Sequence, residues 1–444
     1  MPQIQNSELR TNFALSKELQ KKSHRLVPGG AHTYAKGDDQ FPLASPGFIT
    51  HGEGCHVFDL DGHEYIEYGM GCRAVTLGHA YPAVIEAARA ELSKGCNFSR
   101  PSPLEFELAE ELLDVISGAD MVKFAKDGSD VTTAALKLAR AHTGRDLIAF
   151  CSDHPFFATN DWFIGHTAVN AGIPEAHRNL SLGFHYNDIE SVRRLFAEHQ
   201  GEIAAVILEP AKYDEPQDAF LHQVQELCVQ NGTVFILDEM ITGFRWNVGG
   251  GQREYQIVPD LSCWGKALAN GFSVSALSGK RELMELGGLD HDRERVFLLS
   301  TTHGAETHAL AAAKATIQTY RTEPVIETLY SQGQKLKDGL DQVIKDSGLS
   351  DYLQIHGRPC ALVYHTLDAE RRPCQWFRAL FMQEIIKRGV LGPSFIISYS
   401  HSDSDVQKTI DAVEGALPVY KAALEDGVQN FVDRPTASVY RKYN

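Results

Sequence analysis

The sequence lacks a surplus of positive charge and lacks any long apolar run. Among its 444 residues, Lys and Arg number 42 against 58 Asp and Glu, which gives a net charge of -16 at pH 7. No block of Lys or Arg offsets this balance, so we expect no nucleic acid partner. No uninterrupted apolar run approaches the roughly 18 to 20 residues of a membrane helix, so we expect a soluble protein with no membrane partner.

Cysteine and histidine are present without the spacing of a disulfide framework or a metal site. The eight cysteines form no C-x-x-C pair and follow no secretory signal, which is typical of reduced thiols in the cytoplasm. His51, His56 and His63 lie around a predicted hairpin, where solvated or capping roles are expected rather than metal binding. We therefore expect a cytoplasmic protein without a metal.

The 43% of hydrophobic residues and the chain length are sufficient for a large core, and we expect two lobes. A polar helix is predicted over residues 5–26. Two short alternating runs within 56–68 flank Asp61-Gly62, the dipeptide that a tight type I′ turn prefers, and predict a β-hairpin.

Helical and strand segments alternate after about residue 80. Ala204–Leu208 and Thr233–Leu237 are too uniformly apolar for surface strands and predict central parallel strands covered on both faces. A long helical stretch is predicted over 309–347, then an α+β segment around 362–400 and a terminal helix over 404–424. The pattern predicts an α/β protein with a mostly parallel sheet and a smaller α+β domain.

The first motif that could take part in binding or catalysis is Lys126-Asp-Gly-Ser-Asp130, which precedes a helical pattern over 131–143. Gly128 allows a ligand to approach the backbone, and Ser129 can cap the helix while offering a hydroxyl, so a phosphate could lie at the helix N-terminus. An ordinary capped helix would have the same sequence.

Two predicted strands end in carboxylates, Glu209 and Asp238. Ligands of open α/β sheets gather at the carboxyl ends of strands, so both acids are expected to face a crevice. A helix cap or a loop salt bridge is the alternative for each of them.

Lys266 follows Cys263-Trp-Gly and has small or apolar neighbours. Such neighbours remove solvation, lower the pKa of the amine and favour attack on a carbonyl group, although most lysines are surface residues. A Walker A loop is excluded because Ala267 follows the lysine, and Gly271-Phe-Ser273 lacks the second glycine of a nucleophile elbow.

In combination these residues resemble the class III aminotransferases of PLP-dependent fold type I, most closely the glutamate-1-semialdehyde aminomutase-like group. The similarity covers most of the chain and is carried by the following motifs: Pro28-Gly-Gly30, Asp59-Leu-Asp-Gly-His-Glu-Tyr-Ile-Glu-Tyr68, Leu77-Gly-His79, Gly128 to Arg140, Thr143-Gly-Arg145, Glu209-Pro210, Leu237 to Arg245, Gly265-Lys266 and Thr301 to Glu306. It implies a large cofactor-binding domain over 76–315 and a small domain formed by 1–75 and 316–444.

The resemblance implies pyridoxal 5'-phosphate as cofactor and a role for each matching residue. Lys266 would bind the cofactor covalently and then move the substrate proton, and Asp238 would face the ring nitrogen and keep it protonated. Gly128 and Ser129 would hold the phosphate, Met240 would pack on one ring face, and Glu209 would lie in the same site. Thr302 would reach the phosphate of the neighbouring subunit, which implies a homodimer with shared active sites.

Three departures from the family pattern concern the substrate. Where relatives carry Tyr-His-Gly, this chain has Asp153-His154-Pro155-Phe156, so either His154 or Phe156 could stack on the cofactor, and we favour His154. Gly71-Cys72-Arg73 replaces Ser-Trp-Gly, so Arg73 could pair with a substrate anion or form a structural ion pair. The segment from Gly392 to His401 is shorter than in true aminomutases and lacks their acidic residue.

These departures favour an aminotransferase that moves an amino group from an amino acid donor to an aldehyde or ketone of a small metabolite. The alternative is an intramolecular aminomutase of the glutamate-1-semialdehyde 2,1-aminomutase type. A cofactor-binding protein without turnover is a third reading, but it leaves Lys266 and Asp238 without a purpose.

Overall fold

The computed structural model describes residues 9–154 and 159–443. The chain divides into two compact units. The large unit consists of Pro82–Ile326 with Tyr440–Asn444, and the small unit consists of Met1–Tyr81 with Glu327–Val439. Within the described ranges, no helix combines the length and apolar character needed to cross a membrane.

The large unit is built on a seven-stranded sheet with the strand order β4-β10-β9-β8-β7-β5-β6. Its strands are β4 (Met121–Ala125), β5 (Leu147–Cys151), β6 (Ser181–Phe184), β7 (Ile203–Leu208), β8 (Val234–Asp238), β9 (Leu261–Trp264) and β10 (Ser275–Gly279). Only β10 runs antiparallel to its two neighbours in this sheet. The prediction of a mostly parallel α/β sheet is therefore confirmed, and β7 and β8 are central strands as expected.

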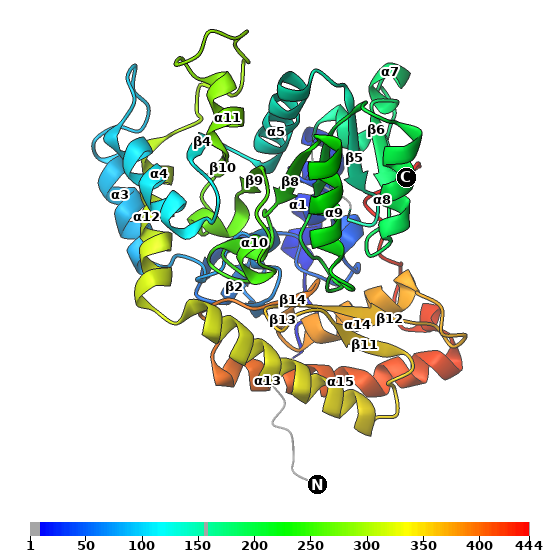
Figure 1. Ribbon diagram of the computed structural model, residues 1–444. Coiled ribbons are helices and arrows are strands. Elements are labelled where there is room, and N and C mark those ends of the chain that lie inside the picture. Colours follow the sequence, from blue (N-terminus) through cyan, green and yellow to red (C-terminus); the bar gives the residue numbers. More distant parts are fainter. Residues whose placement is uncertain (1–8, 155–158, 444) are drawn as a thin grey trace. The chain divides into compact units, whose positions relative to one another are not determined.

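Helices cover both faces of this sheet (Figure 1). The helices of the large unit are α3 (Pro82–Leu92), α4 (Pro103–Val115), α5 (Gly128–Thr143), α6 (Asp161–Ile164), α7 (Glu175–Arg178), α8 (Ile189–Glu198), α9 (Phe220–Asn231), α10 (Gly250–Glu254), α11 (Arg281–Met284) and α12 (Thr307–Thr322). Along β8, Ile236 packs in the core with α5, whereas Phe235 and Leu237 pack in the core with α8 and α9. Side chains of a strand alternate between faces, so an uninterrupted apolar run is what a sheet covered on both sides requires.

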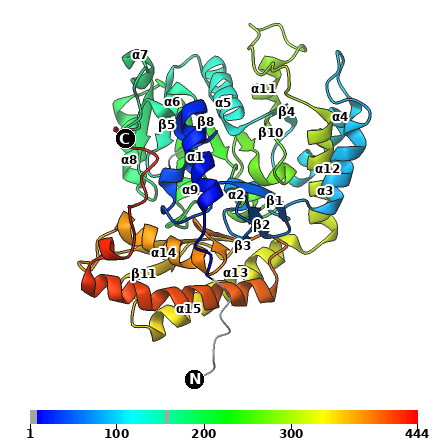
Figure 2. The same cartoon turned by 180° about the vertical axis from the view of Figure 1, so that it is seen from behind.

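The small unit contains two short sheets with the orders β1-β2-β3-β13 and β11-β12-β14. The strands are β1 (Ile49–Glu53), β2 (His56–Asp59), β3 (Glu64–Glu67), β11 (Leu353–His356), β12 (Ala361–Thr366), β13 (Val390–Leu391) and β14 (Phe395–Ile396). The helices are α1 (Ala14–Leu26), α2 (Met70–Arg73), α13 (Val325–Asp346), α14 (Gln375–Lys387) and α15 (Asp403–Asp426). Figures 1 and 2 show α13 and α15 side by side, and Lys335 of α13 forms an ion pair with Asp403 of α15 over 2.6 Å.

The predicted hairpin is present, but its turn is not type I′. Strands β2 and β3 pair antiparallel, and four residues separate them. Gly62 has a positive φ of 91°, whereas Asp61 is not among the residues with positive φ, and a type I′ turn requires positive φ at both central positions. The Asp61 carboxylate instead accepts the backbone N–H groups of Leu15 over 2.7 Å and of Ser16 over 3.0 Å. Asp61 therefore caps the start of α1 rather than serving a tight turn.

Two predicted helices have different bounds in the structure. The N-terminal helix begins at Ala14, and the part of the prediction over residues 5–8 lies outside the described residues. The stretch predicted over 309–347 is two helices, α12 and α13, because Pro324 interrupts it. Proline lacks a backbone N–H and disfavours helical backbone in the residue before it, and Glu323 accordingly has an extended conformation, with φ -118° and ψ 148°.

Candidate active site

The sheet of the large unit brings the predicted chemical groups to one edge. Strands β5, β7, β8 and β9 are parallel neighbours, so their carboxyl ends lie together. Glu209 directly follows β7, Asp238 ends β8, and Lys266 follows β9 two residues after its last residue. Asp238 pairs in register with Cys263, so three residues of chain lead from that pair to Lys266. Ligands of such sheets bind at this edge, so a binding site here stays a prediction that the placement of these residues allows.

Asp238 is a buried carboxylate, with a relative exposure of 4%. Its Oδ1 accepts the backbone N–H of Met240 over 2.9 Å. Burial raises the pKa of Asp238 to about 7, and the nearby charge of Glu209 adds to the rise, whereas Lys266 and the Met240 hydrogen bond oppose it. A buried carboxylate of this kind is poised to share a proton with a cationic partner.

The neighbouring acid, Glu239, has a structural role. Its two oxygens accept the backbone N–H groups of Gly251 over 2.8 Å and of Gln252 over 2.7 Å, and they also accept the hydroxyl of Thr242. Burial raises the pKa of Glu239 to about 7, although these hydrogen bonds oppose the rise. Because Glu239 fixes the loop after β8, Asp238 is the strand-end acid that stays available for chemistry.

Lys266 lies in strained backbone at a partly open position. It begins the short 3-10 helix Lys266–Ala269 and has a positive φ of 35°, which is uncommon for residues other than glycine. It is the one partly exposed residue among the buried residues of 261–270. Strain of this kind is typical of functional positions.

Glu209 is held by a lysine that the motif analysis did not select. Lys212 Nζ donates to Glu209 Oε1 over 2.9 Å, and both side chains are buried. Oε2 of Glu209 is buried and has no hydrogen-bond partner among the described residues. This edge therefore holds the carboxyl groups of Glu209 and Asp238 and the amines of Lys212 and Lys266, and the charges of Glu209 and of both lysines act on Asp238.

His154 lies just beyond the carboxyl end of β5 and is buried, with 4% exposure. Its ring packs on Tyr186 with a centroid distance of 4.3 Å and an angle of 37°, and the Tyr186 hydroxyl donates to the carbonyl oxygen of Pro210 over 2.6 Å. Burial lowers the pKa of His154, and the charge of Glu209 opposes this shift. Phe156, the alternative stacking residue, lies outside the described residues.

The predicted phosphate cradle is the start of α5, a helix of 16 residues. Asp127 caps it by accepting the N–H of Asp130 over 3.1 Å, and the Ser129 hydroxyl accepts the N–H of Thr159 over 3.0 Å. The helix dipole makes this end favourable for an anion. A Cβ on Gly128 would lie 3.1 Å from Sδ of Met240, so a larger residue here would press on the Met240 side chain.

The remaining predicted site residues are Thr302 in the large unit and Arg73 in the small unit. Thr302 is exposed in the segment before α12, where its carbonyl oxygen accepts the side-chain N–H of Asn97 over 3.0 Å. We call Glu209, Lys212, Asp238 and Lys266 the strand-end group. Within the described residues, no hydrogen bond or ion pair joins Thr302 to this group. Arg73 belongs to the small unit, where it ends α2 with a positive φ of 71° and its N–H donates to the carbonyl oxygen of Gly69 over 2.9 Å.

These residues fit a phosphorylated aromatic aldehyde. A helix N-terminus with Gly128 suits the phosphate, Asp238 suits a protonated ring nitrogen, and the amine of Lys266 suits an aldehyde carbon. Nδ1 of His154 and Oε2 of Glu209 are buried without a hydrogen-bond partner in the described part of the chain, so the edge retains polar capacity for a ligand.

The family model described as Aminotransferase class-III matches residues 33–391. The chain therefore belongs to the class III aminotransferases, and its cofactor is pyridoxal phosphate. It is 31% identical over 424 residues to a glutamate-1-semialdehyde 2,1-aminomutase of Desulfatibacillum aliphaticivorans, which covers 90% of this chain and 99% of that protein. It is 29% identical to a 3-aminobutyryl-CoA aminotransferase of Cloacimonas acidaminovorans, with 94% and 99% covered.

Solved structures agree with this assignment. The FumI protein of Sphingopyxis sp. MTA144, solved in its PLP internal aldimine form, is 29% identical with a TM-score of 0.85, covering 95% of this chain and 98% of that one. An omega-transaminase from Sphaerobacter thermophilus is 25% identical with a TM-score of 0.83, covering 91% and 98%. Some of these relatives are named aminomutases and others aminotransferases. This chain is therefore an enzyme of a family whose members are named for both reactions.

Sequence reasoning missed Lys212 and Tyr186. Lys212 follows β7 by four residues, so the rule that selected Glu209, a polar residue at the end of a buried strand, would also have selected it. Tyr186 follows β6 by two residues, but its contact with His154 joins two separate loops. No local pattern reveals a contact of that kind.

Proposed function

We propose that this enzyme is an aminotransferase that passes an amino group from an amino acid donor to an aldehyde or ketone of a small metabolite. The observation that carries the proposal is the placement of Asp238 and Lys266 at the ends of the paired strands β8 and β9. The charge of Lys266 acts on the buried Asp238 carboxylate, so the two groups share one electrostatic environment. Such a pair of acid and amine suits a reaction that moves a proton while charge develops on a bound ring.

Each residue of the site has a role in this proposal. Pyridoxal phosphate supplies a reactive aldehyde and a ring that withdraws electrons. Lys266 holds the cofactor and then moves the proton of the substrate, and Asp238 keeps the ring nitrogen protonated. Gly128 and Ser129 bind the phosphate at the start of α5. Met240 provides apolar surface and His154 aromatic surface for the cofactor ring. Glu209, which is paired with Lys212, contacts the polar groups of the cofactor.

Two sequence features of the small unit support an aminotransferase over an intramolecular aminomutase. Gly71-Cys72-Arg73 brings a cation where the aminomutase pattern has Ser-Trp-Gly, and the loop from Gly392 to His401 lacks the acidic residue of true aminomutases. We propose that Arg73 binds an anionic group of the substrate. A relative named 3-aminobutyryl-CoA aminotransferase, at 29% identity, is consistent with this reading.

The test is a half-reaction followed by visible absorbance. The holoenzyme is mixed with single amino acids and no carbonyl acceptor, and a keto acid is added afterwards. The proposal predicts that one amino donor, with glutamate tested first, removes the cofactor's absorbance band and that the keto acid restores it. A Lys266→Ala variant is the matched control and does not convert the donor at the wild-type rate. An enzyme whose band no amino acid changes would contradict the proposal.

An intramolecular aminomutase is the second candidate, and the relative at 31% identity that bears this name favours it. A mutase rearranges glutamate-1-semialdehyde without any second substrate. Turnover of that compound by the holoenzyme alone, unaffected by added amino donors, would select the mutase. A strict requirement for a separate amino donor would select the transaminase.

We further propose that the enzyme is a homodimer in which Thr302 completes the partner's phosphate site. The support is that Thr302 is exposed and has no hydrogen bond or ion pair to the strand-end group of its own chain within the described residues. The test mixes two inactive variants, Lys266→Ala and Thr302→Ala, by unfolding and refolding them together. Shared sites predict recovery of about a quarter of wild-type activity, because half of the dimers are hybrids with one intact site each. No recovery would contradict shared sites.

A further inference from the structure

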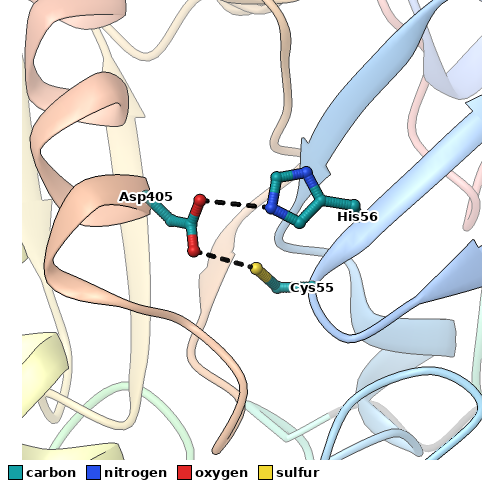
Figure 3. A group of neighbouring side chains, drawn as sticks. All are labelled: Cys55, His56 and Asp405. Carbon is teal, nitrogen blue, oxygen red and sulfur yellow. Dashed lines mark hydrogen bonds and ion pairs between the residues drawn. The ribbon is translucent and has the colours of Figure 1, made fainter.

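A second group of chemically capable side chains lies in the small unit and consists of Cys55, His56 and Asp405 (Figure 3). Oδ1 of Asp405 lies 3.2 Å from Nε2 of His56, and Oδ2 lies 3.4 Å from Sγ of Cys55. One ligand atom from each of the three side chains lies within 4.8 Å of the others. Cys55 and His56 stand at the start of β2, and Asp405 stands in the first turn of α15, 350 residues from Cys55.

A thiolate, an imidazole and a carboxylate are the three kinds of protein ligand that Zn²⁺ accepts. In a tetrahedral zinc site with metal-ligand bonds of about 2.0 to 2.3 Å, neighbouring ligand atoms are separated by about 3.2 to 3.7 Å. Nε2 of His56 and Sγ of Cys55 lie at distances of this size from Asp405, each from a different oxygen of its carboxylate. Because one ligand atom from each side chain already lies within 4.8 Å of the others, small side-chain rotations would place all three around one ion. The charges also match, because one thiolate and one carboxylate neutralise a divalent ion beside a neutral imidazole.

Further groups contact two of these side chains, His56 and Asp405. Nδ1 of His56 lies 2.8 Å from Oε1 of Glu64 on β3, close enough for an ion pair although the geometry is not that of a hydrogen bond. A carboxylate beside the second ring nitrogen is characteristic of metal-bound histidine. Oδ2 of Asp405 accepts the Ser402 hydroxyl over 2.6 Å and the Ser402 N–H over 3.0 Å. Burial would raise the pKa of Asp405, but these hydrogen bonds hold it below its usual range, so the group is ionised at pH 7.

The helix cap alone does not account for the cluster. Asp405 and Ser402 form the capping box of α15, and that pairing is complete without Cys55 or His56. Cys55 and Asp405 are buried, with 1% and 6% exposure, whereas the His56 side chain is 29% exposed. An ion and a coordinated water can therefore reach the cluster from the His56 side.

We propose that Cys55, His56 and Asp405 bind one Zn²⁺ ion, with water in the fourth position, and so join the β2–β3 hairpin to the start of α15. Binding forms a bond from zinc to each of Sγ, Nε2 and the carboxylate, and the thiol proton of Cys55 leaves to solvent without any change of oxidation state. Burial and the neighbouring Asp405 raise the pKa of the Cys55 thiol above its ordinary value, so the metal must displace a proton to bind. The capping or solvated role expected for His56 from the sequence would then describe only the metal-free protein.

The test uses the full-length holoenzyme, stripped of metals with a chelator and dialysed. Zn²⁺ is titrated in competition with a chromogenic chelator, and bound metal is counted by mass spectrometry. The proposal predicts one Zn²⁺ per chain in the wild type, at least about 100-fold weaker binding in Cys55→Ser and His56→Ala, and about 10-fold weaker binding in Glu64→Gln. Cys374→Ser, a cysteine variant of the same unit outside the cluster, binds as the wild type does.

A second measurement does not depend on the variants folding. Co²⁺ replaces zinc in sites of this kind, and a cysteine ligand gives it an intense sulfur-to-cobalt absorption band. The wild type is predicted to show this band at one equivalent of Co²⁺, and Zn²⁺ is predicted to remove it. Absence of both the band and stoichiometric zinc in the wild type would overturn the proposal, as would zinc binding of unchanged affinity in a folded Cys55→Ser variant.

Discussion

Lys212 Nζ donates to Glu209 Oε1 over 2.9 Å, in an ion pair whose two side chains are each 5% exposed. Removing one member leaves the other as an uncompensated buried charge, which is costly. Lys212→Met is therefore expected to lower the free energy of unfolding by about 3 to 5 kcal/mol, measured by urea denaturation of the cofactor-free protein. The double variant Lys212→Met/Glu209→Gln, which removes both charges, is expected to recover most of that loss. A single variant within about 1 kcal/mol of wild type would contradict the buried pair.

Asp238 makes the stability of the cofactor-free protein depend on pH. Its pKa in the folded state is about 7, above the value of about 4 for an unfolded aspartate, so the folded protein keeps this proton over a range where the unfolded chain has lost it. The protonated group favours folding at low pH, and its contribution is lost as the pH rises from about 4 to about 7. Asn at position 238 in the Asp238→Asn variant does not titrate, so this variant does not lose that contribution to the free energy of unfolding as the pH rises.

The measurement compares urea unfolding of cofactor-free wild type and Asp238→Asn across this pH range. The stability of wild type relative to the variant is expected to fall by about 1 kcal/mol per pH unit near pH 5 to 6. Other titrating groups act on both proteins and cancel in the difference. Parallel curves for the two proteins would show that Asp238 is not held protonated by its surroundings.

Met240 fills the space between the start of α5 and the approach to Lys266. A Cβ on Gly265 would lie 2.6 Å from Sδ of Met240, whereas the extended φ of Gly265, -179°, places no restriction on side chains. Gly265→Ala is therefore expected to cost about 1 to 3 kcal/mol of stability through overpacking and to weaken cofactor binding. In a Met240→Ala background the same change is expected to cost much less, because the smaller side chain leaves room. Additive effects in this double-mutant cycle would refute the contact.

The main sheet and the start of the site were predictable because their signals are local. The apolar runs of β7 and β8 predict buried parallel strands, and polar residues at their ends, Glu209 and Asp238, follow from the topology of such sheets. The start of α5 was predictable for a similar reason, since Gly128 and Ser129 precede a clear helical pattern. The break at Pro324 was not predicted. The helical pattern continues on both sides of this proline, so the sequence was interpreted as one helix where the structure has two.

The remaining features depend on contacts between distant segments. Asp61 looked like a turn residue, but its carboxylate caps α1, 45 residues earlier in the chain. Tyr186 contacts His154 across two loops, and Asp405 meets Cys55 across 350 residues. Local patterns carry no information about such pairs, since only the folded sheet order and helix positions bring them together.

The central claim is that Lys266 and Asp238 operate a cofactor-bound transfer of an amino group, and the visible spectrum of the purified protein during a single half-reaction tests it most directly. Wild-type holoenzyme is predicted to lose its yellow band when an amino donor is added and to regain the band with a keto acid. Lys266→Ala is predicted to convert the donor at least about 100-fold more slowly, because it lacks the amine that moves the proton. Equal rates for wild type and Lys266→Ala, or a wild-type protein that cannot take up the cofactor, would contradict the account.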